Sequence, residues 1–394
     1  MSKRLHGTVA TGIRAPIVRE GDDIAEFVSK AVLDFISNRG AALRDRDVVG
    51  VTEALVARAQ GNYANLDDLT ADVREKFPDK TMGVVFPILS RNRFSLLLKA
   101  MARAVDKLYL LLSYPHDEVG NPLVSMDKVD AAGVNPFTDT LSEEKFKALF
   151  GSHNPHRFTG VDYFHFYKNL APNIEIVFSN RPEAILAFTP DVLCADIHSR
   201  FRTKARLQKA GARRLFTMDD LLSKPVNGSG HNPDYGILGS NMASAERIKL
   251  FPRDCGKITL AIQQKLAAAT GKNVEVMVYG DGGFKDPVCG IWELADPVVS
   301  PGYTPGLEGS PSELKIKFLA DSEFSNKQGG ELEDCLKQAI KDKALKLDDM
   351  AGEGTTPRRY VDLLGSLCDL TTGSGDKGTP IVLIQGYFDD YSTE

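Results

Sequence analysis

The spacing of hydrophobic residues in the first part of the chain predicts helices and strands in alternation. Gly21-Asp22-Asp23 offers acidic caps, and apolar residues then recur at helical spacing from Ile24 to Phe35. The β-branched run from Asp47 to Thr52 predicts a buried strand. Residues 54–60 predict a short helix that Gly61 ends. The pattern therefore favours a mixed α/β fold.

The middle of the chain, about residues 82–228, has a different sequence pattern. We expect a helix, or a helix followed by a strand, over residues 94–112, and a strand over residues 173–178. Residues 191–210 are predicted to be helical. The run from Lys224 to Gly230 is the clearest linker-like break in the chain.

The last part of the chain again alternates between helix and strand. It ends in a loop rich in Gly, Ser and Thr, followed by a short apolar strand. The pattern predicts helices over residues 256–270, 331–347 and 360–370, and strands over residues 273–279 and 381–384.

Composition narrows the class of protein. The chain has 394 residues, of which 42% are hydrophobic and 26% charged, as in ordinary globular proteins. A net charge of -5 gives no general attraction to nucleic acid or to anionic membranes. The N-terminus lacks the apolar core of a signal peptide, no apolar run reaches membrane length, and the five cysteines form no C-x-x-C pair. We expect a cytoplasmic protein with reduced thiols.

The segment from Val276 to Pro287 carries the strongest chemical signal. Apolar residues lead directly into Asp281, which stands among glycines, and a second carboxylate follows at Asp286. Open α/β sheets place their chemistry at the carboxyl ends of strands, and Asp oxygens suit Mg²⁺ or Mn²⁺. The alternative is a tight turn, because Gly and Asp dominate turns.

Two further segments are candidates for ligand binding. The loop from Thr371 to Pro380 has free amides, hydroxyls and Lys377, a combination that can surround a phosphate. It does not match the P-loop pattern, and a plain helix-to-strand connection is the alternative. Asn241, after the Gly-rich turn that begins at Gly236, can contact a ligand or cap a helix.

Taken in order, several motifs resemble the coenzyme F-420-0:L-glutamate ligase (gamma-glutamyl ligase) family. The chain has GDDIAE at residues 21–26, DVV at 47–49 and VARAQG at 56–61. It has SN at 240–241 and LFPRD at 250–254, then the Asp281 strand, and finally GSG at 373–375 before PIVLIQG at 380–386. The matches cover about residues 1–77 and 232–394.

The resemblance implies a glutamyl amide ligase that uses GTP, or ATP, together with Mg²⁺ or Mn²⁺. It implies an unusual α/β fold, usually in an intertwined homodimer, with a small-molecule carboxylate and an amino acid as substrates. It assigns Asp281 to the metal site. The residues that it assigns to nucleotide binding are Pro16, Thr52, Glu53, Arg58, Asn241, Thr372, Gly373, Ser374, Gly375 and Lys377.

Three positions depart from the family pattern. Arg58 stands where the family has lysine, Gly282 stands where it has threonine, and Leu238 stands where it has a metal-binding aspartate. A complete metal site then needs another carboxylate, for which Asp234 and Asp286 are the candidates.

These observations lead to one principal hypothesis. Residues 1–81 and 229–394 would form a ligase-like core that binds nucleotide and metal, and residues 82–228 a divergent insertion. The core would join L-glutamate, or a similar amino acid, to a carboxylate such as coenzyme F-420-0 through an acyl phosphate. The alternatives are a folate-like acceptor, or a nucleotide-binding protein on the same fold with reduced catalysis.

Overall fold

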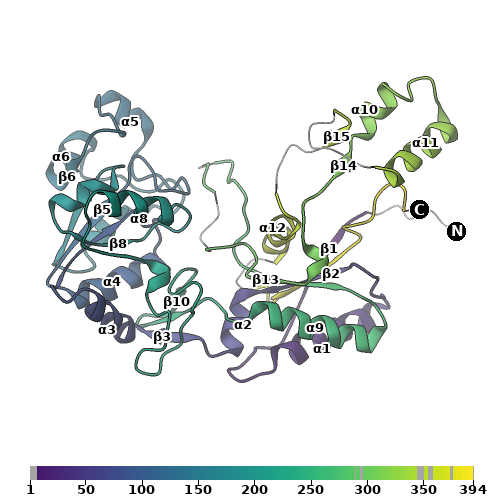
Figure 1. Cartoon of the computed structure of the whole chain (residues 1–394), viewed down its shortest axis with the longest axis horizontal. Helices are drawn as coiled ribbons and strands as arrows, with labels where there is room; N and C mark the ends of the chain where they lie inside the picture. Colours follow the sequence, from purple (N-terminus) through teal and green to yellow (C-terminus); the bar gives the residue numbers. More distant parts are fainter. Residues whose placement is uncertain are drawn as a thin grey trace.

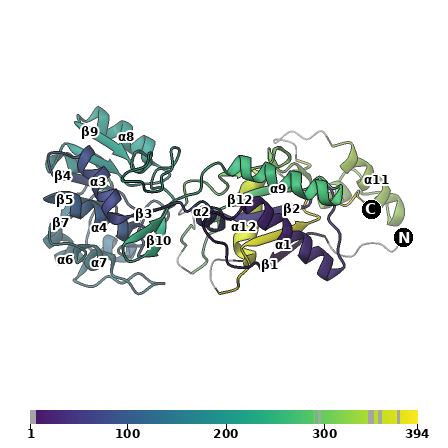
Figure 2. The same cartoon turned by 90° about the horizontal axis from the view of Figure 1, so that it is seen from below.

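The computed structural model describes residues 7–288, 290–292, 296–343, 350–353, 358–372 and 376–393. These residues form two lobes joined at the centre of the molecule (Figures 1 and 2). We call residues 7–61 and 251–393 the terminal lobe, and residues 62–250 the inserted lobe. No helix among the described residues is long and apolar enough to cross a membrane.

The terminal lobe is built on a five-stranded sheet with the order β1-β16-β2-β12-β13. Only β2 and β12 pair in parallel; the other pairs are antiparallel. The elements of this lobe are β1 (Val9–Ile13), α1 (Ile24–Arg39), β2 (Val48–Thr52), α2 (Glu53–Ala59), α9 (Cys255–Thr270), β12 (Glu275–Tyr279), β13 (Gly302–Tyr303), η3 (Pro305–Leu307), α12 (Tyr360–Thr372) and β16 (Ile381–Gln385).

Helices cover both faces of this sheet, because side chains of a strand point alternately to opposite sides. On one face α1 and α9 pack over a cluster that includes Val49, Val51, Val276 and Val278. On the other face α12 packs over Val48, Met277, Tyr279 and Val382. The result is a three-layer arrangement in which β2 and β12 are central and fully covered.

A small extension leaves the terminal lobe beside the chain termini (Figure 1). It has its own apolar cluster, around Leu319 and Leu336. Its elements are β14 (Glu313–Leu314), α10 (Ile316–Asp321), α11 (Gly329–Lys341) and β15 (Gly352–Glu353).

The inserted lobe contains a six-stranded sheet with the order β6-β7-β5-β4-β8-β9, parallel except for the edge strand β6. The order reverses between β4 and β8, as in doubly wound folds. Its elements are β3 (Tyr63–Asn65), α3 (Leu66–Lys76), β4 (Thr81–Val85), α4 (Phe94–Ala104), β5 (Lys107–Leu112), α5 (Met126–Ala131), β6 (Leu141–Ser142), α6 (Glu143–Phe150), α7 (Tyr163–Lys168), β7 (Ile174–Phe178), η1 (Pro182–Ala187), β8 (Asp191–Cys194), α8 (Arg200–Lys209), β9 (Arg214–Thr217), η2 (Met218–Asp220), β10 (Asn241–Ser244) and β11 (Arg247–Lys249).

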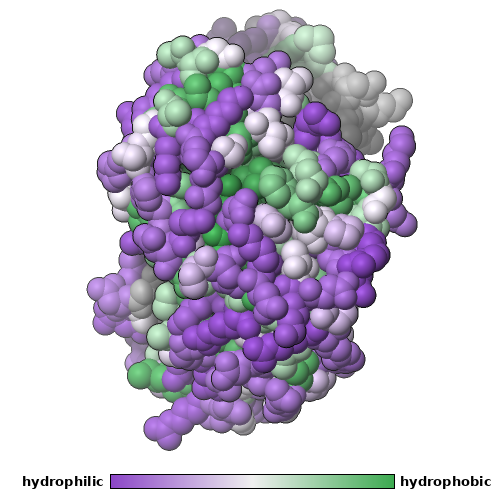
Figure 3. Space-filling view, turned by 90° about the vertical axis from the view of Figure 1, so that its left-hand side faces the viewer, coloured by the Kyte–Doolittle hydropathy of each residue, from purple (hydrophilic) through white to green (hydrophobic). Residues whose placement is uncertain are grey.

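One apolar cluster, running from Ala64 to Leu250, holds this lobe together. A second cluster, which includes Val192 and Leu207, covers the opposite face of the sheet. The outer end of the lobe is mostly hydrophilic, with hydrophobic residues exposed near its middle (Figure 3). The lobe therefore has an interior of its own.

The chain crosses between the lobes twice, and the two crossings are tied side by side. The Gln60 side chain donates to the Arg253 carbonyl (2.6 Å) and accepts from the Arg253 amide (2.9 Å). The Asn62 side chain donates to the Phe251 carbonyl (2.8 Å) and accepts from the Arg253 guanidinium (2.6 Å). These bonds fix the entry and exit of the inserted lobe relative to one another.

Most of the predicted elements are present. Asp23 caps α1 by accepting from the amides of Ala25 and Glu26, and residues 94–112 form a helix followed by a strand. The helix predicted over residues 191–210 is wrong in its first part, because Asp191–Cys194 is the buried strand β8 and helix begins only at Arg200. A short, fully buried strand has no polar alternation by which it could be told from a helix.

The inserted lobe is wider than the segment of residues 82–228 that the sequence marked out. Its main cluster begins at Ala64 and ends at Leu250, so β3, α3, β10 and β11 belong to it. β3 pairs with β11 in a small antiparallel sheet, which joins the two ends of the lobe. The linker-like run from Lys224 to Gly230 therefore lies within the inserted lobe.

The contact between β2 and α12 gives a test of the terminal lobe. A Cβ at Gly50 would lie 2.4 Å from the Cys368 sulfur, whereas a Cβ at Gly256, in α9, would have nothing within 4 Å. Gly50→Ala should therefore lower the free energy of unfolding in urea by about 1–3 kcal/mol. Gly256→Ala should leave it unchanged or raise it by up to about 1 kcal/mol. Equal stability of the two variants would contradict this packing.

Candidate active site

A cavity of about 370 Å³ lies at the edge of the terminal-lobe sheet, where the inserted lobe meets it. Residues from widely separated parts of the chain line it, and most belong to the terminal lobe. They are Ala15, Pro16, Ile17, Val18, Thr52, Glu53, Ala54, Leu55, Arg58, Arg93, Asn241, Tyr279, Gly280, Asp281, Asp369, Thr372, Gly378, Thr379 and Pro380.

Strand pairing explains why these segments converge. The parallel strands β2 and β12 are in register to their last residues, with Thr52 opposite Tyr279. The residues that follow, Glu53 and Asp281, therefore emerge at the same edge of the sheet. Antiparallel β16 begins at this edge, and its neighbour β1 ends there. The edge is the carboxyl end of both parallel strands, where α/β sheets bind ligands.

Arg93, the residue before α4 of the inserted lobe, reaches into a group of carboxylates. Its guanidinium donates to Asp281 Oδ2 (2.5 Å) and to Asp296 Oδ1 (2.7 Å). Asp296 also accepts from the Asp281 amide (2.7 Å), and a Cβ at Gly280 would lie 2.2 Å from its Oδ2. The glycine is therefore needed for the close approach of the two aspartates.

A second buried charge pair joins the lobes beside the cavity. Glu53, at the start of α2, accepts a hydrogen bond from Lys249, at the end of β11, and both side chains are almost fully buried. The other carboxylate oxygen, Oε2, is buried without a hydrogen-bond partner among the described residues. An acceptor oxygen left in this state is poised to bind a cation or a donor group.

The carboxylates outnumber the cations that neutralise them. Burial, with the nearby Asp296 carboxylate, raises the pKa of Asp281 to about 7, although Arg93 opposes the shift. Burial likewise raises the pKa of Glu53, which Lys249 opposes. Carboxyl groups whose pKa is raised by burial in a cleft indicate a functional site, and a further cation would stabilise their charged form.

The cavity brings together seven of the residues that the resemblance assigned to nucleotide or metal. They are Pro16, Thr52, Glu53, Arg58, Asn241, Asp281 and Thr372. Arg58 is anchored by its Nε, which donates to the Val18 carbonyl (2.7 Å), and Thr372 is hydrogen-bonded to the Tyr279 hydroxyl (2.9 Å). Asp281 follows the end of β12 by two residues, as the sequence predicted.

Three of the other candidate residues do not line the cavity. Lys377 is exposed and is not among the residues that line the cavity. Asp286 lies in the loop after Asp281, where its carboxylate accepts from the Val288 amide (2.9 Å). Asp234 is exposed in a turn of the inserted lobe. Gly373, Ser374 and Gly375 lie outside the described residues.

Leu238, which stands where the family has an aspartate, is fully buried in the core of the inserted lobe. It therefore contributes no group to the cavity. The carboxylates with the largest effect on Asp281 are instead Asp296, Asp369 and Glu53. No three His, Cys, Asp or Glu residues among those described lie together closely enough to hold a metal ion by themselves.

Sequence reasoning did not single out Arg93, Asp296 or Lys249 as site residues. Arg93 is 188 positions before Asp281, in the segment without a family motif, and no local pattern connects them. Asp369, in α12, also lines the cavity, and the sequence analysis gave it no role.

Comparison with known protein families identifies the family to which the chain belongs. A family model described as F420-0:Gamma-glutamyl ligase matches residues 12–386, nearly the whole chain, and the protein belongs to this family. The match spans the inserted lobe as well as the terminal lobe. Membership indicates a ligase enzyme. A search of curated proteins finds no match for the chain.

The Glu53–Lys249 pair gives a test of the junction. Lys249→Met leaves a buried carboxylate without its counter-charge and should lower the free energy of unfolding by about 3–5 kcal/mol at pH 8. Because the folded-state pKa of Glu53 is raised, the penalty grows as the pH rises through that pKa and shrinks below it, where the carboxyl is neutral. Urea unfolding of variant and parent at pH 5 and pH 8 measures the difference.

Lys257→Met is the matched control, because Lys257 pairs with Asp254 at the exposed surface (2.6 Å). It should change stability by less than about 1 kcal/mol at either pH. A Lys249→Met variant with the same small, pH-independent effect would show that the buried pair is absent in solution.

Proposed function

We propose that this protein joins the amine of L-glutamate to the carboxylate of a small-molecule acceptor of the F420-0 type, using GTP or ATP and Mg²⁺ or Mn²⁺. The observation that carries the proposal is the single cavity lined by seven residues that the family resemblance assigns to nucleotide and metal binding. These residues come from five separate segments of the chain. From the family resemblance we further propose a homodimer, which light scattering tests.

The triphosphate would bind along the wall formed by Pro16, Thr52, Arg58, Asn241 and Thr372. Arg58 offers a cation at the mouth of the cavity, and its guanidinium is already oriented by the Val18 carbonyl. The hydroxyl of Thr52 and the amide of Asn241 are donors suited to phosphate oxygens. The wall thus offers a cation and neutral donors to a triphosphate, and a divalent ion would offset the carboxylates beside it.

The carboxylates in the cavity fit a divalent cation. Asp281 has a third of its side chain exposed, and Glu53 has an oxygen without a partner among the described residues. Mg²⁺ usually keeps some waters and takes one or two carboxylates together with the phosphates of its substrate. Asp281 and Glu53 would therefore suffice as protein ligands. The bound ion would neutralise charge on the transferring phosphoryl group.

The reaction requires activation of the acceptor, because a carboxylate is a poor electrophile. A carboxylate oxygen of the acceptor attacks the γ-phosphorus, and the bond to the β-phosphate oxygen breaks, which gives an acyl phosphate and a nucleoside diphosphate. The glutamate amine then attacks the acyl carbon, loses a proton and displaces inorganic phosphate. The protein's part is to position the reactants and to keep water from the acyl phosphate.

Replacement of Asp281 tests the proposed chemistry. Asp281→Asn should reduce phosphate release by on the order of a hundredfold or more in an assay with GTP, Mn²⁺, glutamate and a carboxylate acceptor. Asp286→Asn is the matched comparison on the same loop. Because the Asp286 carboxylate is bonded to the Val288 amide and does not line the cavity, we expect a much smaller effect.

Each outcome of this comparison has a distinct meaning. A large loss only in Asp286→Asn would place the metal site at Asp286, one of the two candidates for the additional carboxylate. Nucleotide binding by the parent without phosphate release, across a broad panel of acceptors, would contradict the ligase proposal and favour a nucleotide-binding protein.

A further inference from the structure

Arg93 lies between two carboxylates, in the position of their counter-cation. Each arm of its guanidinium contacts a different aspartate, Nη2 at Asp281 and Nη1 at Asp296. The Asp296 side chain is only 1% exposed and that of Arg93 only 19%. Without a cation between them, the two aspartates could not both remain charged.

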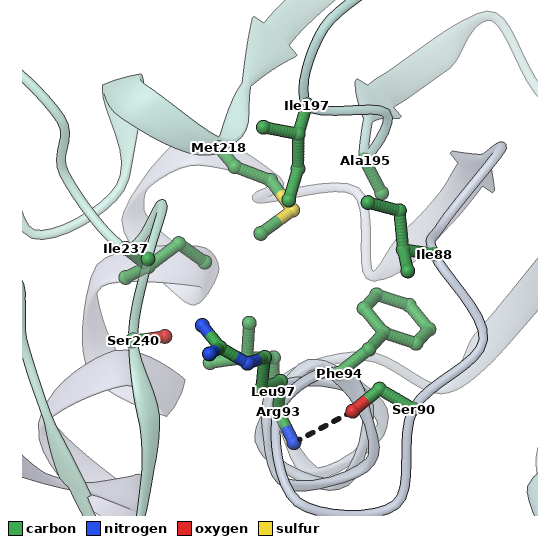
Figure 4. A pocket seen from close by; sticks show the side chains of 11 residues that line it. Ile88, Ser90, Arg93, Phe94, Leu97, Ala195, Ile197, Met218, Ile237 and Ser240 are labelled. Atoms are coloured by element: carbon green, nitrogen blue, oxygen red, sulfur yellow. Dashed lines mark hydrogen bonds between the residues drawn. The ribbon is translucent and has the colours of Figure 1, made fainter. Parts of the chain in front are cut away.

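The inserted lobe holds the arginine firmly in this position. The loop before α4 is fixed by the Tyr167 hydroxyl, which accepts from the Ser90 amide (2.7 Å), and by the Asn92 carbonyl, which accepts from Met242 (2.8 Å). The Arg93 amide donates to Ser90 Oγ (3.1 Å), as the dashed line in Figure 4 shows. The arginine is thus presented by a braced loop rather than by a free side chain.

The stem of Arg93 also lines a small apolar cavity of the inserted lobe, with a volume of about 30 Å³. Figure 4 shows the Arg93 side chain overlapping Leu97, with the guanidinium on the side of Ser240. Arginine commonly packs its methylene groups on apolar surface while its head group reaches a polar site. Here the stem belongs to one lobe and the head group to the carboxylates of the other.

We propose that Arg93 is a resident cation of the ligase site, supplied by the inserted lobe in place of a metal ion between Asp281 and Asp296. The site then needs only one divalent ion, held by Asp281 and Glu53 and brought with the nucleotide. Arg93 is a positioning residue in this scheme. It orients the Asp281 side chain toward the cavity. Because Arg93 belongs to the inserted lobe, the site is complete only when that lobe is in place. The statement that the site needs one divalent ion rests on the proposed function. The statement that Arg93 takes the place of a metal ion between Asp281 and Asp296 does not.

The inference is tested by the number of Mn²⁺ ions that the full chain binds without nucleotide. Electron paramagnetic resonance of free Mn²⁺ gives this number directly. Arg93→Ala should bind one more Mn²⁺ per chain than the parent, because the two aspartates lose their counter-ion. Arg93→Lys keeps a positive charge and should bind no additional ion. The double variant Arg93→Ala/Asp296→Asn should lose the additional ion again.

Stability provides a second readout. Mn²⁺ should raise the melting temperature of Arg93→Ala more than that of the parent, since a ligand that binds only the folded state stabilises it. If Arg93→Ala does not fold even with Mn²⁺, Arg93→Gln, which retains hydrogen bonding without the charge, is measured in its place with the same expectation. Equal numbers of bound Mn²⁺ in the parent and in the folded neutral variant would overturn the inference.

The two proposals can fail separately. If Arg93→Ala binds an additional Mn²⁺ but the parent releases no phosphate with any acceptor, the resident cation is supported and the ligase assignment is refuted. Acceptor-dependent phosphate release by the parent, with no additional Mn²⁺ in the variant, would do the reverse.

Discussion

The structure depends on buried ion pairs that join its two lobes. Arg93 and Lys249 belong to the inserted lobe, and the carboxylates that they contact, Asp281, Asp296 and Glu53, belong to the terminal lobe. A buried charge without its partner costs several kcal/mol. A shift of the lobes that breaks these pairs while the groups stay buried is therefore strongly disfavoured. The junction therefore positions the lobes and completes the candidate site at once.

The geometry of the sheet determines where these charges meet. Because β2 and β12 run in parallel and in register, Glu53 and Asp281 leave the sheet at the same edge. Gly280 leaves room for Asp296 to approach the Asp281 amide. The inserted lobe then covers this edge with the start of α4 and the end of β11. An acidic residue at the end of a strand is by itself a common feature of turns. Here the covering lobe encloses this edge in a cavity with an excess of carboxylates.

The sequence predicted the parts of this site that depend on local pattern. Asp281 was predicted because a carboxylate follows an apolar strand, and Thr52, Glu53 and Arg58 were assigned through the family resemblance. Arg93 and Asp296 were not predicted because their role depends on a contact between the lobes. The two residues are 203 positions apart in the sequence, and no local pattern connects them. The strand at Asp191–Cys194 was missed because complete burial removes the alternation that identifies a strand.

The most direct test is a crystal structure with Mn²⁺ and a non-hydrolysable nucleoside triphosphate, with data collected at the manganese absorption edge. The account predicts one anomalous peak, coordinated by Asp281 and Glu53 together with phosphate oxygens. The triphosphate should lie along Thr52, Arg58 and Asn241, and Arg93 should remain bonded to Asp296. A manganese ion between Asp281 and Asp296 with Arg93 displaced, or a triphosphate bound outside this cavity, would contradict it.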